Sequence, residues 1–202
     1  MEKEVKAAII AALGTIMVAV IGIYANSFFH PEDPTNSQLP IVWNFDDARE
    51  NLDGWERTGT TVPWKTLSDT VEWHDKWGDA EGVIVIDSCY KPAENIDAAA
   101  GIKKSMHIPS KAKSLVADIV KIEQDGGIRF AIMGSSGSHI LGEERLSGRT
   151  KKTVSYDITK WAGESVTLEI MSFGWGVPTG TCPAGTENCC GEYIGLDKVE
   201  II

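Results

Sequence analysis

The sequence predicts an all-β protein, an antiparallel β-sandwich or jelly roll, preceded by one N-terminal transmembrane helix. Three observations lead to this prediction. Glycine and tryptophan are abundant, with 20 Gly and 7 Trp in 202 residues, which is typical of turn-rich β proteins. Short β-branched segments alternate with turn signals over most of the chain. Before these segments, residues 7–25 form a run without a charged side chain.

The charge-free run at residues 7–25 has the length of a membrane span. As a helix it would extend roughly 28 Å, close to the thickness of a bilayer core. Lys3 and Lys6 precede it, and the next Lys or Arg is Arg49, so the positive-inside rule places the N-terminus in the cytoplasm. We therefore expect a single-pass protein of the cell membrane that contacts the lipid bilayer through residues 7–25 and carries an extracytoplasmic domain.

The preferred interpretation of residues 1–26 is an uncleaved signal anchor. Two alternatives remain open from the residues alone. One is a secretory signal peptide cleaved after Ala25, although the apolar run is long for that purpose. The other is a leader similar to those of archaeal type IV prepilins, cleaved near Lys6 and Ala7.

Residues 27–40, with three prolines, predict an extended linker to a single domain at residues 41–202. Within this domain, seven segments are short, apolar or alternating, and rich in β-branched residues. They are residues 41–45, 82–87, 114–122, 127–133, 152–156, 165–171 and 193–202. Turn signals rich in Gly, Asp and Ser separate them, which favours an antiparallel sandwich or jelly roll.

Five short motifs follow one another along the domain: Asn44-Phe45-Asp46 with Gly54-Trp55, then residues 82–88, 128–134, 156–164 and 194–199. In this order they resemble the galactose-binding-like jelly roll of non-catalytic carbohydrate-binding modules, most closely the sandwich modules attached to fructan-cleaving glycoside hydrolases. The resemblance implies a carbohydrate-binding sandwich with Trp55 and Trp161 in its core. Residues 177–191 depart from the family pattern, because they form an insertion that holds three cysteines.

The same resemblance implies a structural calcium ion, the one cofactor expected. Modules of this kind often hold calcium between the opening acidic residue and an aspartate of the closing strand, which are Asp46 and Asp197 here. Carboxylate oxygens from separate segments are ligands that Ca²⁺ prefers. The alternative is that both residues are ordinary strand-end carboxylates in an acidic protein.

Four tryptophans, Trp64, Trp73, Trp77 and Trp175, fall in segments predicted to be loops. Sugars present apolar C–H faces and hydroxyl edges, so their binding sites combine an aromatic platform with hydrogen-bonding groups. The resemblance adds Glu192 and Tyr193, which stand where the related modules form part of the ligand edge. These six residues are the candidate glycan site. Packing of the tryptophans beneath loops or at an interface is the alternative.

The chain has four cysteines, Cys89, Cys182, Cys189 and Cys190. In an extracytoplasmic domain we expect them to be oxidised. A bond between the adjacent Cys189 and Cys190 would be strained, so two other pairings are favoured. In both, Cys89 bonds to one of the adjacent pair and Cys182 to the other. The spacing lacks the CxxC pairs of structural zinc sites.

The composition and the motifs also narrow the function. A net charge of −10 argues against a nucleic-acid partner. The sequence carries no nucleophile elbow, no zinc-protease motif and no nucleotide-binding loop, so no enzyme is expected. We expect a non-catalytic, membrane-anchored surface protein that recognises a glycan or a partner envelope protein. The alternative is a structural or accessory subunit of a membrane complex or a pilus-like filament, as a homo- or hetero-oligomer.

Overall fold

The computed structural model describes residues 38–202 except residues 50, 62–65, 92–95, 122–125 and 174–191, and it describes only the backbone of residues 89–91, 96, 97 and 192. The chain divides into two compact units, Met1–Ser37 and Gln38–Ile202. The predicted membrane span at residues 7–25 therefore lies outside the described residues. Within residues 38–202, as far as they are described, no helix is long and apolar enough to cross a membrane.

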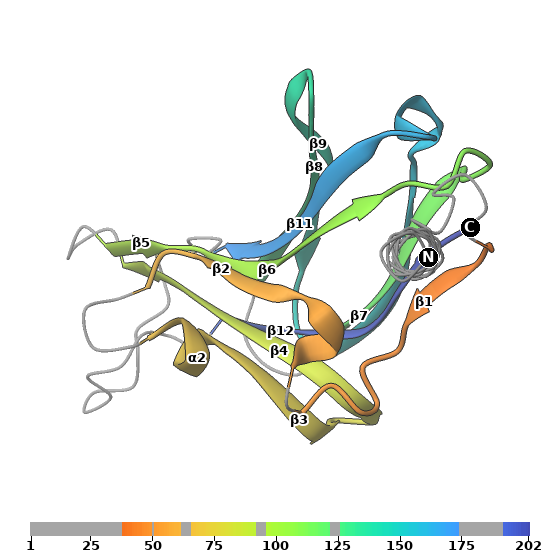
Figure 1. Ribbon diagram of the computed structural model, residues 1–202. Helices are drawn as coiled ribbons and strands as arrows, with labels where there is room; N and C mark the ends of the chain where they lie inside the picture. Colours follow the sequence, from red (N-terminus) through yellow and green to blue (C-terminus); the bar gives the residue numbers. More distant parts are fainter. Residues whose placement is uncertain (1–37, 50, 62–65, 92–95, 122–125, 174–191) are drawn as a thin grey trace, which may run out of the picture. The chain divides into compact units, whose positions relative to one another are not determined.

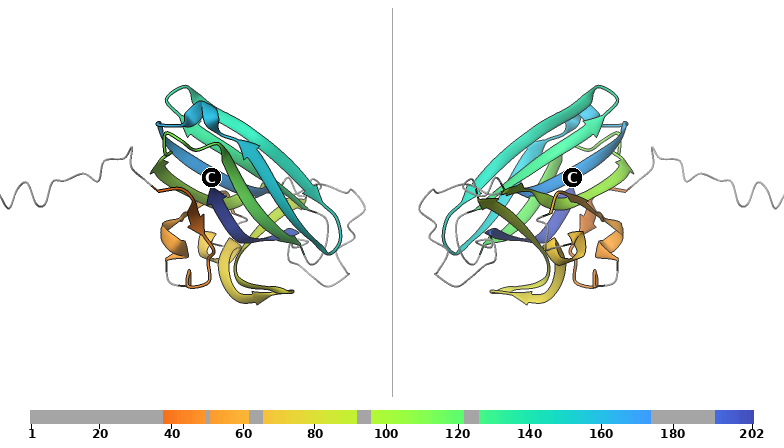
Figure 2. Two further views of the ribbon diagram at one scale, coloured as in Figure 1. Left: turned by 90° about the vertical axis from the view of Figure 1, so that its right-hand side faces the viewer. Right: turned by 90° about the vertical axis from the view of Figure 1, so that its left-hand side faces the viewer.

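The domain is an antiparallel β-sandwich of two sheets, as predicted (Figures 1 and 2). One sheet has seven strands, in the order β10-β7-β12-β4-β3, with β1 beside β12 and β5 beside β4. Their bounds are β10 Thr150–Asp157, β7 Ser114–Lys121, β12 Glu192–Ile201, β4 Ala80–Lys91, β3 Val71–Trp77, β1 Ile41–Trp43 and β5 Ile96–Ala98. The first strand of the domain thus pairs with the last one, Ile41 opposite Ile201.

The second sheet has five strands in the order β2-β6-β11-β8-β9. Their bounds are β2 Glu56–Gly59, β6 Ala100–His107, β11 Ser165–Phe173, β8 Gly126–Gly134 and β9 Gly137–Leu146. Three single-turn helices complete the described part of the domain: the 3-10 helices η2 Leu52–Gly54 and η4 Thr159–Trp161, and the α-helix α2 Leu67–Thr70.

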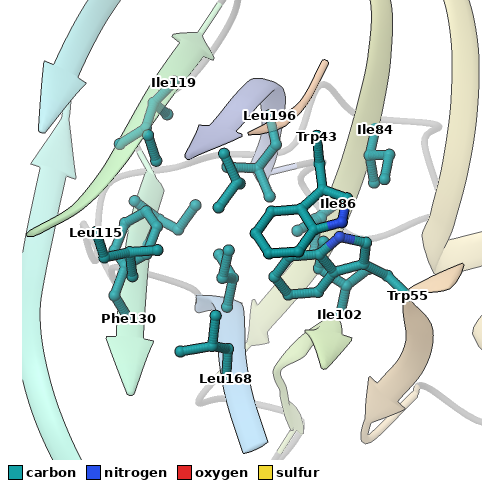
Figure 3. Close-up of a cluster of buried hydrophobic side chains, with 14 of the residues drawn as sticks. Trp43, Trp55, Ile84, Ile86, Ile102, Leu115, Ile119, Phe130, Leu168 and Leu196 are labelled. Atoms are coloured by element: carbon teal, nitrogen blue, oxygen red, sulfur yellow. The ribbon is translucent and has the colours of Figure 1, made fainter. Parts of the chain in front are cut away.

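One apolar core fills the space between the sheets. Strand β11 shows the period of two that builds it, because Val166, Leu168 and Ile170 are buried while the residues between them are only partly buried. The indole rings of Trp43 and Trp55 meet edge to face, with centroids 5.3 Å apart. Figure 3 shows both indoles close to Ile86 and Ile102, with Leu115, Phe130 and Leu168 across the core. Burial of such side chains is the dominant favourable contribution to folding.

The expected strands and core tryptophans agree with the structure. Each of the seven expected segments coincides with a strand over most of its length. The expected core residues Trp55 and Trp161 are both buried. One expectation is wrong: Trp73 and Trp77 lie in β3 and not in a loop. Strand β3 lies at the edge of its sheet and has a mostly polar sequence. It therefore lacks the apolar run from which a strand would be predicted.

Candidate functional site

The β3–β4 hairpin shapes one edge of the seven-stranded sheet. Trp77 pairs with Ala80 across a tight turn formed by Gly78 and Asp79, and Gly78 has a φ of +64° that favours glycine. Gly82 also has a positive φ, +62°, and a Cβ there would lie 2.5 Å from the Cα of Asp46. The segment after β1 therefore packs directly against β4 at a position where only glycine fits.

The outer face of the seven-stranded sheet carries its own small apolar cluster. Along β4, Ile84 and Ile86 belong to the core, whereas the alternate residues Val83 and Val85 belong to this second cluster. Ala80, Val83, Val85 and Val120 are its buried members, and we call them the apolar floor. Because side chains alternate between the faces of a strand, the floor lies on the side of the sheet that faces away from the five-stranded sheet.

Two aromatic side chains, Trp77 of β3 and Tyr193 of β12, pack on the apolar floor. Their ring centroids are 5.8 Å apart and their planes are inclined by 56°. We call them the aromatic pair. The ring of His74 also contacts Trp77, with centroids 5.1 Å apart. A Cβ on Gly195 would lie 3.2 Å from Cδ1 of Trp77, so the absence of a side chain there lets the indole lie close to the sheet.

Trp77 is positioned by packing and not by a hydrogen bond to the described part of the chain. Its buried Nε1 finds no acceptor among the described residues. Trp73, two positions earlier on the same strand, differs: its Nε1 donates to the carbonyl oxygen of Phe45 at 2.7 Å, and the Arg49 guanidinium lies 4.8 Å from its ring centroid. Trp73 therefore holds the segment after β1, while Trp77 belongs to the outer face.

A cavity of about 270 Å³ adjoins the aromatic pair. It is lined by residues 78–80 of the hairpin, by Val120 and Lys121 of β7, and by residues 149–151 at the start of β10. Ala80 and Val120 belong both to this lining and to the apolar floor. The cavity therefore adjoins the apolar floor on which the aromatic pair packs.

Ion pairs surround the cavity. Arg149 Nη2 lies 3.2 and 3.3 Å from the two carboxylate oxygens of Asp79. Lys151 Nζ donates to Asp197 Oδ2 at 2.7 Å, and this hydrogen bond raises the pKa of Lys151 above its ordinary value, against a smaller opposing effect of burial. Further along the same face, Lys198 contacts Glu200 at 3.1 Å, a contact that raises the pKa of Lys198. The outer face thus has an aromatic half and a charged half.

Lys121 fixes the backbone beneath the aromatic pair. Its side chain is fully buried, and its Nζ donates to the carbonyl oxygen of Tyr193 at 2.8 Å. A Cβ on Gly126 would lie 3.3 Å from the same Nζ, so the glycine makes room for the ammonium group. Burial of a cation is costly unless it is hydrogen-bonded, so this contact ties the end of β7 to the start of β12.

Of the six predicted ligand residues, the structure brings together Trp77 and Tyr193. Trp73 is half-buried and contacts the core and Phe45. Trp64 and Trp175 lie outside the described residues. Glu192 begins β12, where its backbone pairs with Ser88, and its side chain lies outside the description.

The two predicted calcium ligands have other contacts in the structure. Asp46 accepts a hydrogen bond from Asn44 Nδ2 at 2.6 Å, and Asp197 is paired with Lys151. Among the described residues, no group of three or more His, Cys, Asp or Glu side chains could hold a metal ion. Calcium binding at Asp46 and Asp197 stays a prediction.

The predicted disulfides fall on parts of the chain that the structure does not describe. The backbone of Cys89 lies in β4, opposite Ala98 of β5. Its side chain, like Cys182, Cys189 and Cys190, lies outside the description. Both pairings of the four cysteines stay predictions.

Reasoning from the sequence missed the cavity and the residues beneath the aromatic pair. The valines at positions 83 and 85 form one apolar run with the isoleucines at 84 and 86, which hides the fact that the two types face opposite sides of β4. A continuous run of this kind is typical of a strand buried on both faces, and this signal could have indicated a covered or binding surface outside the core.

The fold is similar to that of solved carbohydrate-binding modules and adhesin domains. TmCBM27, a carbohydrate-binding module studied for specific mannan recognition, is 14% identical, with a TM-score of 0.52 over 81% of this chain and 98% of that one. The family 11 carbohydrate-binding module from Clostridium thermocellum, solved with a β-1,3-1,4-mixed-linked tetrasaccharide, is 11% identical, with a TM-score of 0.51 over 81% of this chain and 95% of that one.

A third similar structure is the K1 cleaved adhesin domain of Lys-gingipain from Porphyromonas gingivalis W83. It is 13% identical, with a TM-score of 0.50 over 82% of this chain and 98% of that one. No protein-family model matches the chain, and no curated protein matches it. At these identities, the likeness establishes the fold alone: an all-β antiparallel sandwich of the kind found in carbohydrate-binding modules.

Proposed function

We propose that this protein is a non-catalytic glycan-binding protein whose binding surface is the outer face of the seven-stranded sheet. The observation that carries the proposal is the aromatic pair of Trp77 and Tyr193, 5.8 Å apart on an apolar floor beside a cavity of about 270 Å³. Aromatic rings stack on the apolar C–H faces of sugars, and nearby polar groups bind the hydroxyls.

The groups beside the aromatic pair suit this chemistry. The phenol of Tyr193 and the side chains of Asp79, Arg149 and Thr150 supply both donors and acceptors within one surface. Two proteins of similar fold are a module with specific mannan recognition and a module in complex with a mixed-linked tetrasaccharide. Their likeness raises the expectation of a glycan ligand but does not identify the sugar.

The site has the character of a binding surface and not of a hydrolytic centre. Glycoside hydrolysis uses two carboxyl groups that face each other across the scissile bond. In the part of the chain that the structure describes, Asp79 lines the cavity and contacts Arg149, and Asp197 contacts Lys151 of the lining. Each carboxylate is thus occupied by a cation and does not stand as a free acid or base, so binding without turnover is the proposed activity.

The proposal includes the location at a membrane surface. Residues 7–25 would anchor the chain, and the domain would bind its glycan outside the cytoplasm. Alkaline carbonate extraction of native membranes tests this part by itself. Retention of the full-length chain in the membrane pellet supports the anchor, and release into the supernatant contradicts it.

The experiment for glycan binding uses the full 202-residue chain in mild detergent. An array of neutral and acidic oligosaccharides is screened first, and calorimetry then gives the affinity for each glycan that binds. Trp77→Ala and Tyr193→Ala should each weaken binding at least tenfold, which corresponds to about 1.4 kcal/mol. Trp77→Phe keeps a smaller ring and should lose less.

The control is Ile140→Ala, which removes a large side chain that is 58% exposed on the five-stranded sheet. This variant should bind as the unchanged protein does. Circular dichroism of every variant confirms that the sandwich is folded. Unchanged binding by folded Trp77→Ala and Tyr193→Ala, or no binding to any glycan, would reject the proposed function.

A further inference from the structure

The orientation of the Trp77 indole depends on the side chains that pack against it. Its Nε1 finds no acceptor among the residues that the structure describes, and the alanine and valine side chains of the apolar floor offer no directional contact. A ring that stacks on a sugar must nevertheless hold one orientation, because ordering a side chain during binding costs affinity. The neighbours of the indole therefore bear on the strength of glycan binding.

His74 contacts Trp77 from the same strand, β3. The two ring centroids are 5.1 Å apart and the planes are inclined by 64°, an edge-to-face arrangement that aromatic rings favour. In a regular strand, residues three positions apart face opposite sides of the sheet. The rings of His74 and Trp77 meet nevertheless, beside the tight turn that follows β3. The contact is therefore a particular feature of this end of the strand and not a consequence of strand alternation.

His74 belongs to the outer face of the seven-stranded sheet. It lies opposite Val83 of the apolar floor, and Glu72 lies opposite Val85 of the floor. Oε2 of Glu72 is 3.3 Å from Nε2 of His74, and the two side chains are 53% and 33% exposed. A contact with this exposure is weak, but it favours one orientation of the imidazole. His74 is thus placed beside the floor, with its ring against the indole.

The indole receives its other described ring contact from a different strand. Tyr193 of β12 lies 5.8 Å from Trp77 between centroids, with the planes inclined by 56°. Contacts from two strands restrict the indole more than one contact does. Removal of the imidazole would leave Tyr193 and the apolar floor, neither of which forms a hydrogen bond to the Trp77 nitrogen.

We infer that His74 is a positioning residue of the proposed glycan site. Its ring holds the Trp77 indole in the orientation that stacks on a sugar, and the Glu72 carboxylate orients the imidazole. His74 acts through Trp77 and does not itself touch the sugar. This inference rests on the proposed function and adds to it a residue that sets the affinity for the glycan.

The first measurement follows the indole in the absence of any glycan. The full chain is labelled with fluorotryptophan in mild detergent, and fluorine NMR of Trp77→Phe identifies the Trp77 resonance among those of the 7 tryptophans. His74→Ala should shift and broaden this resonance, because the indole then samples several orientations. His74→Phe keeps a ring at this position and should give a single narrow resonance. An unchanged Trp77 resonance in folded His74→Ala would overturn the inference.

The matched control is His139→Ala. The ring of His139 lies 5.7 Å from that of Trp161, with planes inclined by 60°, so the same substitution removes a similar ring contact from β9 of the five-stranded sheet. It should leave both the Trp77 resonance and the glycan affinity unchanged. If it lowers the affinity as much as His74→Ala does, the effect is a general loss of packing and the inference is wrong.

The second measurement is calorimetry with mannohexaose, cellohexaose and each further glycan that binds in the array. His74→Ala should weaken binding about fivefold, as expected for loss of one aromatic contact. Glu72→Ala should weaken it only about twofold, because its contact is exposed. His74→Phe should recover most of the affinity. If His74→Ala is unfolded by circular dichroism, His74→Leu replaces it, since leucine fills the space without an aromatic ring and should weaken binding similarly.

The double variant distinguishes positioning from direct contact. In the Trp77→Ala background, His74→Ala should cause no further loss of affinity in an NMR titration with millimolar glycan. A further loss would mean that the imidazole contacts the sugar itself, which overturns the positioning role.

The outcomes separate the inference from the function on which it rests. Unchanged affinity of His74→Ala, with binding weakened by Trp77→Ala, overturns the inference and leaves the glycan-binding function intact. Binding of no glycan by the unchanged protein rejects both proposals, whatever the fluorine spectra show.

Discussion

Ser88 and Ser172 share a hydrogen bond between their hydroxyl oxygens, 2.9 Å long, across the interior of the sandwich. Ser88 belongs to β4 and Ser172 to β11, so the bond joins the two sheets, and both side chains are buried. A buried hydrogen bond contributes about 1 kcal/mol net. A double-mutant cycle with Ser88→Ala and Ser172→Ala should therefore give a coupling free energy of about 1 kcal/mol in urea unfolding.

The matched control for this cycle is the pair Ser105 and Thr167. Their hydroxyls are also 2.9 Å apart, but they lie at an exposed position of the five-stranded sheet. The coupling between Ser105→Ala and Thr167→Ala should be at most about half as large, because water competes for exposed hydroxyls. Equal coupling in both cycles would contradict the role given to the buried pair.

Trp73 and Trp77 should respond differently to the same substitution. Trp73→Phe removes the hydrogen bond to the Phe45 carbonyl, so it should lower the free energy of unfolding by about 1–3 kcal/mol and leave glycan affinity unchanged. Trp77→Phe removes an indole N–H without an acceptor among the described residues, so it should cost less stability and weaken glycan binding. Chemical denaturation and calorimetry of both variants measure the difference. A reversed pattern would mean that Trp73, and not Trp77, faces the ligand.

Alanine substitutions at Gly82 and Gly148 should distinguish the stability cost of backbone strain from the cost of steric overlap. Their φ values are almost equal, +62° and +61°, but a Cβ on Gly82 would lie 2.5 Å from the Cα of Asp46, whereas nothing lies within 4 Å of one on Gly148. Gly148→Ala should lose about 1–2 kcal/mol of stability from strain alone. Gly82→Ala should lose that amount and roughly 1–3 kcal/mol more from overlap with the backbone. Thermal and urea unfolding measure both losses, and equal losses would exclude a close contact at Gly82.

Ionisation of Tyr156 should make the free energy of unfolding of the domain depend on pH in the alkaline range. Burial raises the pKa of its phenol well above the ordinary value, and the charge of Glu144, which accepts its hydrogen bond at 3.2 Å, raises it further. In the unfolded chain the phenol ionises near pH 10, so above this pH the unfolded state loses a proton that the folded state keeps. The contribution of the protonated Tyr156 phenol to the free energy of unfolding is therefore complete below about pH 10 and is lost as the pH rises toward the pKa of Tyr156 in the folded protein.

The measurement is the free energy of unfolding between pH 8 and pH 12 for the unchanged protein and for Tyr156→Phe. The unchanged protein should lose more stability over this range than the variant does, because the variant lacks the ionising group. Absorbance of the phenolate should also show one of the 4 tyrosines titrating late. Parallel stability curves would mean that Tyr156 ionises equally in both states.

The strands that the sequence predicts are those with an apolar or strictly alternating pattern. Segments such as β7 and β11 are central in their sheets and bury one or both faces, so burial leaves its period in the sequence. Of the strands not expected, β2, β3 and β9 lie at sheet edges with mixed polar residues, whereas β6 lies between β2 and β11 and carries the mixed sequence Ala100–His107. Their pairing is decided by neighbours distant in the chain, which a local pattern does not contain.

The candidate site could be predicted only in part for the same reason. The sequence indicates Trp77 as a tryptophan in a segment predicted to be a loop, and the resemblance to carbohydrate-binding modules indicates Tyr193. Their proximity depends on the pairing of β12 with β4 and of β4 with β3. Arg149 carries no signal in the sequence, since its place beside Asp79 follows from the turn before β10 lying near the β3–β4 hairpin.

Because β1 pairs with β12, a pulling force on the chain before β1 would be transmitted directly to β12. Residues 1–37 join the domain just before β1, and β1 is hydrogen-bonded to the far end of the strand that begins with Glu192 and Tyr193. Tension in the preceding chain would therefore reach Tyr193 of the proposed glycan surface along one strand and would not have to cross the interior between the sheets. If the domain is anchored and binds a glycan as proposed, the paired strands would resist a pull in shear, and β1, only three residues long, would be the element that separates first.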